Sequence, residues 1–236
     1  MICKIADLLV EIPASGGMAP RCGEYLHRGN ERADIVIRTE FYSRDKYPEN
    51  SSEDSIGYME SGRQFYAALI SFDGFFLHAS AVELDGRAYL FSAPSGTGKS
   101  THTRLWQSLY GNAAQVFNDD KPALRRLNGC WYAYGTPWCG KDGINQNKKI
   151  PLAGICFLKR GNMNQIRRLD NKEAVQKVFS QTFRKFWKIE KIELMLSHVD
   201  KLVREIPIYE LECLPNEDAA RVSYETMRRG AEENGL

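Results

Sequence analysis

The residues best suited to chemistry form one short run, Ala93-Pro94-Ser95-Gly96-Thr97-Gly98-Lys99-Ser100-Thr101. Its glycines allow the backbone to curl so that successive N–H groups point at one spot, which suits a phosphate. Lys99 can reach the β- and γ-phosphates of a nucleotide, and the Ser100 hydroxyl can bind Mg²⁺. The run departs from the pattern G-x-x-x-x-G-K-[ST] at its first position, where alanine replaces glycine. We expect this run to bind ATP with Mg²⁺; the alternative is a Gly/Ser turn that ends by chance in Gly-Lys-Ser.

The flanking elements are those that a phosphate loop needs. Ala88–Ser92 is typical of a buried strand that leads into the loop. Thr101–Tyr110 is typical of a helix, and Gly111 is a common residue at a helix end. The N-terminus of that helix adds the positive end of its dipole to the site. Strand, loop and helix in this order favour the nucleotide site over a chance turn.

An acidic pair, Asp119-Asp120, follows the loop and offers partners for a metal ion and for a proton. Asp119 lies twenty residues after Lys99, so one helix and one turn separate them and the two can lie on neighbouring strands. One carboxylate would hold Mg²⁺, and the other would accept the proton of an attacking hydroxyl. The residues alone leave open which aspartate has which role. The alternative is a solvated turn before Lys121-Pro122.

The order of these motifs resembles the catalytic domain of HPr kinase/phosphorylase. The shared order is His78-x-Ser80-x-Val82, a turn glycine, S-G-T-G-K-S and Asp-Asp. The S-G-T-G-K segment is also similar to the phosphate loop of ATP-dependent phosphoenolpyruvate carboxykinases, which share that nucleotide-binding fold. The resemblance covers Phe75–Leu158, about a third of the chain. It is closest to small HPr-kinase-like proteins that carry a G-x-P-W-x-G-K segment, here residues 135–141.

This resemblance implies a mixed α/β fold of the kind shared by HPr kinase and the carboxykinases, and it implies a role for each site residue. Asp119 would be the general base, with His78 beside it and Lys99 as a further catalytic residue. Asp120 would bind the metal together with Ser100. The alternative for His78, which lies in an apolar strand, is a hydrogen-bonded core histidine.

The segment around residues 135–147 offers two residues for contact with a substrate, Trp138 and Lys141. The alternatives are a long connection for the segment and a solvated side chain for Lys141. Thr101 and the residues after it differ from HPr kinase, which has a glutamate after the loop serine, and this leaves the phosphate acceptor open.

The chain divides into an N-terminal strand-rich segment with an exposed connection, residues 1–56, packed on a kinase-like P-loop domain, residues 57–236. Helices and strands do not alternate strictly, so we expect a mixed sheet rather than a doubly wound one. The expected strands are Ile5–Ile12, Ala33–Ile37, Phe75–Val82, Ala88–Ser92, Ala114–Asn118, Ala123–Leu127, Cys130–Tyr134, Pro151–Leu158 paired with Asn164–Leu169, and Ile208–Cys213. The expected helices are Gly57–Leu69, Thr101–Tyr110, Asp170 to Lys185, Ile189–Arg204 and Glu217–Arg229.

Composition narrows the class of protein. The net charge of +2 gives no electrostatic case for nucleic acid as a partner, and we assign the basic run Arg184–Lys188 to a helix end. No stretch approaches the ~20 apolar residues of a membrane span, so no membrane is expected. Six cysteines without C-x-x-C spacing indicate structural thiols in a reducing compartment, which we take as the cytoplasm. His27, His102 and His198 are expected at the surface or at helix caps. Self-association is left open.

These observations favour a kinase that moves the γ-phosphoryl group of ATP to a hydroxyl of a peptide, protein or small molecule. A nucleotide-binding switch or scaffold without phosphotransfer is the alternative, because such a protein needs a metal ligand but no base. A decarboxylating carboxykinase is excluded, since the chain has no room for the oxaloacetate-binding half of those enzymes. The acceptor itself is not named by the sequence.

The loop assignment predicts the effect of Lys99→Ala on nucleotide binding. Loss of a charge-assisted contact to phosphate should weaken Mg²⁺-ATP binding by about ten- to a hundredfold, from roughly 1.5–3 kcal/mol. Isothermal titration calorimetry of the parent and the variant measures the difference. Equal affinity of the two proteins would show that the run is not a phosphate loop.

Overall fold

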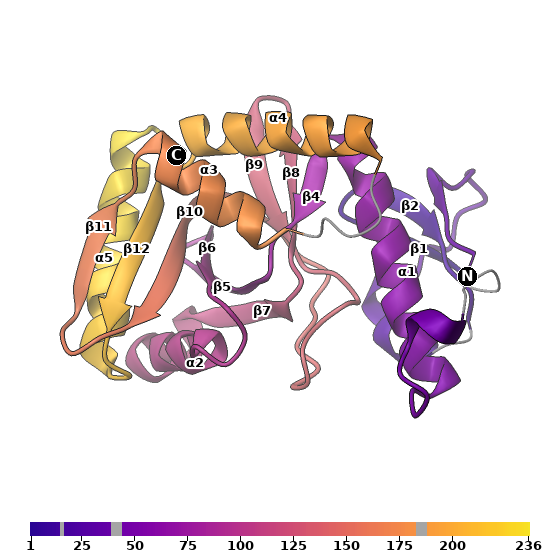
Figure 1. The fold of residues 1–236 in the computed structure, drawn as a ribbon, viewed down its shortest axis with the longest axis horizontal. Helices are drawn as coiled ribbons and strands as arrows, with labels where there is room; N and C mark the ends of the chain where they lie inside the picture. Colours follow the sequence, from indigo (N-terminus) through magenta and orange to yellow (C-terminus); the bar gives the residue numbers. More distant parts are fainter. Residues whose placement is uncertain (15–16, 39–43, 183–187) are drawn as a thin grey trace.

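The fold is taken from a computed structural model that describes residues 1–14, 17–38, 44–182 and 188–236. Two sheets organise it, a three-stranded sheet near the N-terminus and a nine-stranded mixed sheet in the centre (Figure 1). The small sheet contains β1 (Ile2–Ile5), β2 (Leu8–Glu11) and β3 (Ile35–Val36). The central sheet contains β4 (Gly74–Phe76), β5 (Ala79–Leu84), β6 (Arg87–Ser92), β7 (Gln115–Asp120), β8 (Ala123–Leu127), β9 (Cys130–Tyr134), β10 (Lys149–Arg160), β11 (Gln165–Arg168) and β12 (Ile208–Cys213).

The longest strand, β10, joins the two halves of the central sheet. Its first residues pair antiparallel with β9, and the rest pair in parallel with β6 on one side and β12 on the other. A register shift between Leu152 and Gly154 lets the strand bend between these partners. The order β4-β8-β9-β10-β6-β5-β7, with β12 and β11 added at β10, therefore makes the mixed α/β architecture that the sequence predicts.

Helices cover both faces of this sheet. The structure contains α1 (Glu53–Leu69), α2 (Lys99–Tyr110), α3 (Asn171–Ser180), α4 (Ile189–Glu205) and α5 (Glu217–Glu233). On one face α3 and α4 bury residues such as Val178 and Leu202 against the sheet; on the other, α2 and α5 bury Trp106 and Met227 (Figure 1). In the described part of the chain, no helix is long and apolar enough to cross a membrane.

The predicted strand Ile5–Ile12 is wrong, because Ala6 and Asp7, both with positive φ, form a tight turn between β1 and β2, which pair antiparallel. Two further predictions are wrong for a different reason. The run Phe75–Val82 is not one strand, because the chain changes partners within it: β4 pairs with β8, whereas β5 pairs with β6 and β7. The segment Asn164–Leu169 does not pair with β10, because β12 occupies that edge of β10 and β11 adds to the far side of β12. Both errors concern partners distant in sequence, which local apolar patterns do not specify.

The N-termini of the helices follow the capping residues in the sequence more closely than the strands follow the apolar pattern. Asp170 forms the expected N-cap, in a capping box with Glu173. Ser52 caps α1, so this helix begins at Glu53, four residues before the predicted start. The third predicted helix, Asp170 to Lys185, is too long, because α3 ends at Ser180 and Gln181 is its C-cap. Residues 184–187 of the basic run lie outside the described residues.

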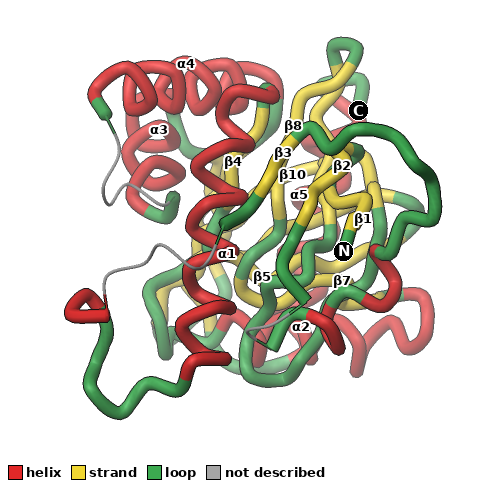
Figure 2. Tube along the Cα trace, turned by 90° about the vertical axis from the view of Figure 1, so that its right-hand side faces the viewer, coloured by secondary structure: helices red, strands yellow, loops and turns green. Residues whose placement is uncertain are grey.

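The N-terminal layer shares a core with the rest of the molecule. The small sheet packs beside α1 (Figure 2), and its buried residues join Phe65 of α1 and Trp138 in one apolar cluster. Arg125 of β8 is buried and donates hydrogen bonds to the carbonyl oxygens of Phe72 and Ala6. The described residues of the small sheet thus lie against the larger part of the chain through both apolar and polar contacts.

Because α1 packs closely on Trp138, we expect Gly62→Ala to lower the free energy of unfolding, the opposite of the usual effect of alanine in a helix. Alanine within a helix ordinarily stabilises by about 1 kcal/mol relative to glycine. Here a Cβ at position 62 would lie 2.9 Å from Cδ1 of the buried Trp138 ring, so we expect a loss of about 1–3 kcal/mol from overpacking. Urea unfolding measures it. Gly23→Ala is the control, because a Cβ there meets no atom within 4 Å; a stabilised Gly62→Ala protein would contradict the packing.

Candidate functional site

The loop predicted to bind phosphate connects β6 to α2 with the backbone that such a loop needs. Gly96 has φ +78° and Gly98 has φ +120°, values that favour glycine because L side chains rarely adopt them. Gly98 is the N-cap residue of α2, and its carbonyl accepts the hydrogen bond of the His102 N–H at 2.9 Å. The first N–H groups of α2 therefore face the hollow of the loop, where an anion would be stabilised.

Alanine at the first loop position is accommodated by the core. The Ala93 side chain is fully buried in the apolar cluster beneath α2 and α5. Its carbonyl oxygen accepts a hydrogen bond from Lys99 Nζ at 3.1 Å. Burial lowers the pKa of Lys99, against the opposing effect of Asp120 and Asp119, which favour the charged form. A phosphate bound to this ammonium group would form a stronger, charge-assisted hydrogen bond than the Ala93 carbonyl oxygen does.

Arg160, which the sequence analysis does not single out, forms hydrogen bonds to the backbone of the loop. Arg160, the last residue of β10, donates to the carbonyl oxygen of Gly96 at 2.6 Å and to that of Thr97 at 3.4 Å. These contacts turn the two carbonyls toward the guanidinium group and away from the phosphate hollow. Only the parallel pairing of β10 with β6 brings this residue beside the loop.

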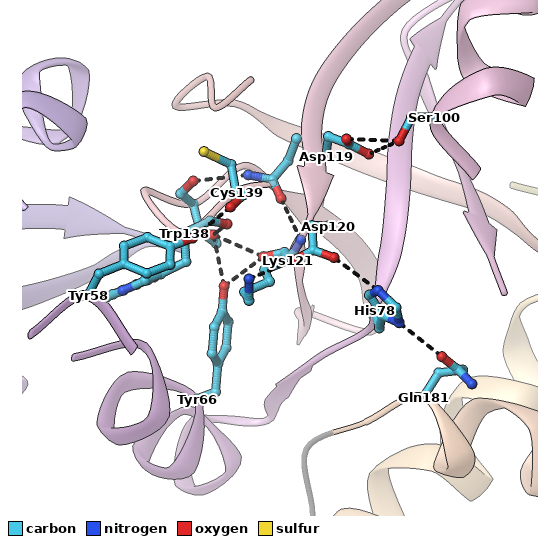
Figure 3. Close-up of polar contacts among 12 residues, drawn as sticks. Tyr58, Tyr66, His78, Ser100, Asp119, Asp120, Lys121, Trp138, Cys139 and Gln181 are labelled. Atoms are coloured by element: carbon cyan, nitrogen blue, oxygen red, sulfur yellow. Dashed lines mark hydrogen bonds and ion pairs between the residues drawn. The ribbon is translucent and has the colours of Figure 1, made fainter. Parts of the chain in front are cut away.

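The two aspartates at the end of β7 face different partners (Figure 3). Asp119 is buried and accepts a hydrogen bond from the Ser100 hydroxyl, at 3.0 Å for Oδ2 and 3.3 Å for Oδ1. Asp120 instead lies 2.9 Å from His78 Nε2 and 2.5 Å from Lys121 Nζ. Asp120 also has φ +91°, a strained value for a residue other than glycine.

Electrostatics at Asp120 favour its ionised form. Burial alone would raise its pKa, but the hydrogen bond from His78 and the charge of Lys121 outweigh burial and hold the pKa well below its usual value. The other ring nitrogen of His78, Nδ1, lies 3.1 Å from Oε1 of Gln181. Lys121, Asp120, His78 and Gln181 therefore form a continuous polar chain beside the loop (Figure 3).

One cavity of about 500 Å³ collects most of the predicted site residues. Its lining comes from the loop, the end of β7, the residue before β5 and the segment after β9, namely His78, Ser95, Gly96, Gly98, Lys99, Ser100, Thr101, Asp119, Asp120, Gly140, Lys141 and Asp142. Pro94 and Thr97, also predicted to bind the nucleotide, line an adjoining hollow with Lys159 and Arg160 instead.

The donor set fits Mg²⁺ bound through a nucleotide. Within the described ranges, no group of three or more His, Cys, Asp or Glu residues is placed to hold a metal ion by itself. Mg²⁺ characteristically binds one or two carboxylates and completes its shell with phosphates and waters. Ser100 and Asp119, in mutual contact at the phosphate loop, would supply such ligands.

Comparisons with known proteins identify the family. The family model described as SynChlorMet cassette protein ScmC matches residues 49–216, which include the loop and both aspartates. The chain belongs to the ScmC family. No curated protein matches it. Among solved structures, the Hpr(Ser) kinase/phosphatase from Coxiella burnetii is 11% identical, with a TM-score of 0.36, 68% of this chain and 96% of that chain covered. The mixed α/β fold of the chain is established by its own strand order.

Other residues singled out in the sequence lie away from the cavity. Trp138 is 1% exposed, stacks on Phe65 at 4.8 Å between ring centroids and donates to Ser61, so its side chain is part of the core. His102 and His198 are buried, not at the surface as expected. Burial lowers the pKa of His102 to about 3, and its Nε2 lies 3.1 Å from the Ser223 hydroxyl.

The contacts of Arg160 predict that this residue holds the loop in a conformation suited to phosphate. Arg160→Met removes the donors to Gly96 and Thr97, and we expect Mg²⁺-ATP affinity to fall by about three- to tenfold, from roughly 1 kcal/mol for exposed hydrogen bonds. Calorimetry measures the affinity. Arg168→Met is the control, because this exposed arginine of β11 bonds to Asn234. Equal losses in both variants would contradict a specific role for Arg160.

Proposed function

We propose that this protein is an Mg²⁺- and ATP-dependent phosphotransferase that transfers the γ-phosphoryl group to a hydroxyl. The observation that carries the proposal is the content of one cavity. It contains the phosphate loop with Lys99, a serine–aspartate pair suited to a metal, and a second carboxylate with a histidine beside it. A nucleotide switch requires the first two features but has no use for the third.

The contacts favour an exchange of the two aspartate roles relative to the sequence prediction. Asp119 touches the Ser100 hydroxyl, and the serine of such a loop is itself a metal ligand, so the two oxygens are placed to share one ion. We assign Asp119 to the metal for this reason. Asp119 and Ser100 would hold Mg²⁺ there, and its positive charge would offset the negative charge that develops during phosphoryl transfer.

Asp120 is then the residue that faces the acceptor. Its carboxylate stays ionised beside His78 and Lys121, so it can accept a hydrogen bond from the acceptor hydroxyl and orient its oxygen toward the γ-phosphorus. As the new O–P bond forms and the bond to ADP breaks, the hydroxyl proton moves to Asp120 and from there to water. A strong base is unnecessary, because the transition state of phosphoryl transfer is loose and late proton movement suffices.

Lys99 and the loop amides hold the phosphates during this step. The Lys99 ammonium group would leave the Ala93 carbonyl for the β- and γ-phosphates, and the N–H groups of α2 would face the transferred group. Once the nucleotide is bound, both sources of positive charge would be in place before transfer, so little further reorganisation is needed as charge shifts toward ADP.

Transfer itself is tested with γ-³²P-labelled ATP and Mg²⁺ against pools of Ser- and Thr-containing peptides and of small hydroxy compounds. Label in an acceptor with the parent protein and its absence with Lys99→Ala would support the proposal. Tight ATP binding by the parent, with no transfer to any pool and no release of ADP, would contradict it and favour the nucleotide switch.

The exchanged assignment makes opposite predictions for the two aspartates. Asp120→Asn should lower ADP release at saturating Mg²⁺-ATP by about 10²–10⁴-fold, since a positioned base contributes that much, while ATP affinity changes little. Asp119→Asn should weaken Mg²⁺-ATP binding and raise the Mg²⁺ concentration needed for half-maximal rate. Steady-state rates over a Mg²⁺ series distinguish the two. Should Asp119→Asn lose turnover at unchanged Mg²⁺ dependence while Asp120→Asn loses affinity, the roles are those predicted from sequence.

A further inference from the structure

A third hollow at the loop is distinct from the site cavity and from the adjoining hollow that Pro94 lines. It has a volume of about 430 Å³ and shares Gly96, Gly98 and Thr101 with the phosphate cavity. We define the groove by six residues from α2, the end of β10 and the end of β12: Thr101, His102, Leu105, Leu158, Cys213 and Leu214. A molecule could therefore extend from the loop into this groove without leaving the protein surface.

Most of the groove wall is apolar, and two cationic residues, Lys159 and Arg160, also line the hollow. Leu158 is buried, Leu105 is partly buried and Leu214 is 38% exposed, unusually open for a large aliphatic side chain. Burial raises the pKa of the Cys213 thiol, so this thiol stays protonated and neutral near pH 7. His102 is buried, and its Nε2 lies 3.1 Å from the Ser223 hydroxyl, so the ring already has a polar partner inside the protein. Such a surface favours a flat apolar group over a charged one.

We propose that this groove binds the nucleobase of the phosphoryl donor and does so with little discrimination between bases. The inference rests on the proposed function, because the phosphates at the loop bring the nucleoside to the groove. A purine that lies against Leu105 and Leu214 removes apolar surface of both partners from water, which stabilises the complex. Thr101, in the first turn of α2, borders both hollows and marks the passage between them.

Weak base discrimination follows from the hydrogen bonds that already exist at the rim. The Leu214 N–H donates to Asn164 Oδ1 at 2.9 Å, and the Leu214 carbonyl accepts from the Asn216 N–H at 3.0 Å. The Cys213 carbonyl accepts from the Gly161 N–H at 3.2 Å, and Pro215 has no N–H to offer. Base edges are told apart by hydrogen bonds, whereas burial of a ring face is tolerant of its identity.

Cations at the mouth of the groove have partners too. Lys159 Nζ lies 3.0 Å from Glu212 Oε2, and Arg160 donates to the loop carbonyls. These contacts direct the Lys159 ammonium group toward Glu212 and the Arg160 guanidinium group toward the loop, rather than toward the edge of a base. We expect the affinities for ATP and GTP to differ by less than about tenfold, because burial of the ring face contributes similarly for both bases.

The test compares ATP with inorganic tripolyphosphate, each with Mg²⁺, by calorimetry. The parent should bind ATP at least about tenfold more tightly than tripolyphosphate, because tripolyphosphate lacks the base. The double variant Leu105→Gln, Leu214→Gln should lose about tenfold in ATP affinity and leave tripolyphosphate affinity unchanged. Leu196→Gln is the matched control, since Leu196 is 39% exposed on α4, on the opposite side of the sheet (Figure 1). Circular dichroism and thermal melting confirm that each variant is folded.

The outcomes separate this inference from the proposed function. Equal binding of ATP and tripolyphosphate by the parent, or equal losses of both ligands in the double variant, would overturn the nucleobase groove and leave the phosphate site intact. A preference for ATP over GTP of a hundredfold or more would overturn weak discrimination. If neither ligand binds the parent protein, the proposed function fails and the groove fails with it.

Discussion

The geometry of the site depends on the register of one strand, β5. This strand pairs with β6, which leads into the phosphate loop, and with β7, which ends in the aspartates. Ala79 lies opposite Ser92 on one side and Asp120 on the other, and His78 immediately precedes it. A slip of β5 by one residue would turn every side chain to the other face of the sheet. Lysine, carboxylates and histidine would then no longer share a cavity.

Hydrogen bonds of two serine hydroxyl groups, those of Ser80 and Ser92, stabilise this register of β5. The Ser80 hydroxyl lies 3.0 Å from that of Thr103 in α2, so the helix after the loop is tied to the strand between loop and acids. The Ser92 hydroxyl donates to the carbonyl oxygen of His78 at 2.8 Å, across the same ladder. Buried hydroxyl groups left without such partners would be costly, and these contacts therefore disfavour alternative pairings.

Two buried charged side chains, Lys99 and Asp119, lie in the cavity. Lys99 is 9% exposed and Asp119 is 7% exposed, and taking such groups out of water is unfavourable unless partners restore what water provided. Asp119 has a serine hydroxyl and Lys99 has a carbonyl, which are weaker partners than a metal ion and a phosphate. A nucleotide with its metal would supply both at once, so binding can recover part of the free energy spent in folding the site.

Local pattern in the sequence determined the strand–loop–helix order around residues 93–101, the glycines with positive φ and the N-cap at Asp170, because each depends on residues close together in the chain. The succession of helices and strands also predicted a mixed α/β fold. Tertiary structure alone decided the rest. The break after Phe76, the place of β11 beside β12 and the burial of Trp138 all depend on partners distant in sequence. The same holds for the two aspartates: adjacent residues on a strand point to opposite sides, so which one meets Ser100 and which meets His78 is settled only when α2 and β5 pack around β7.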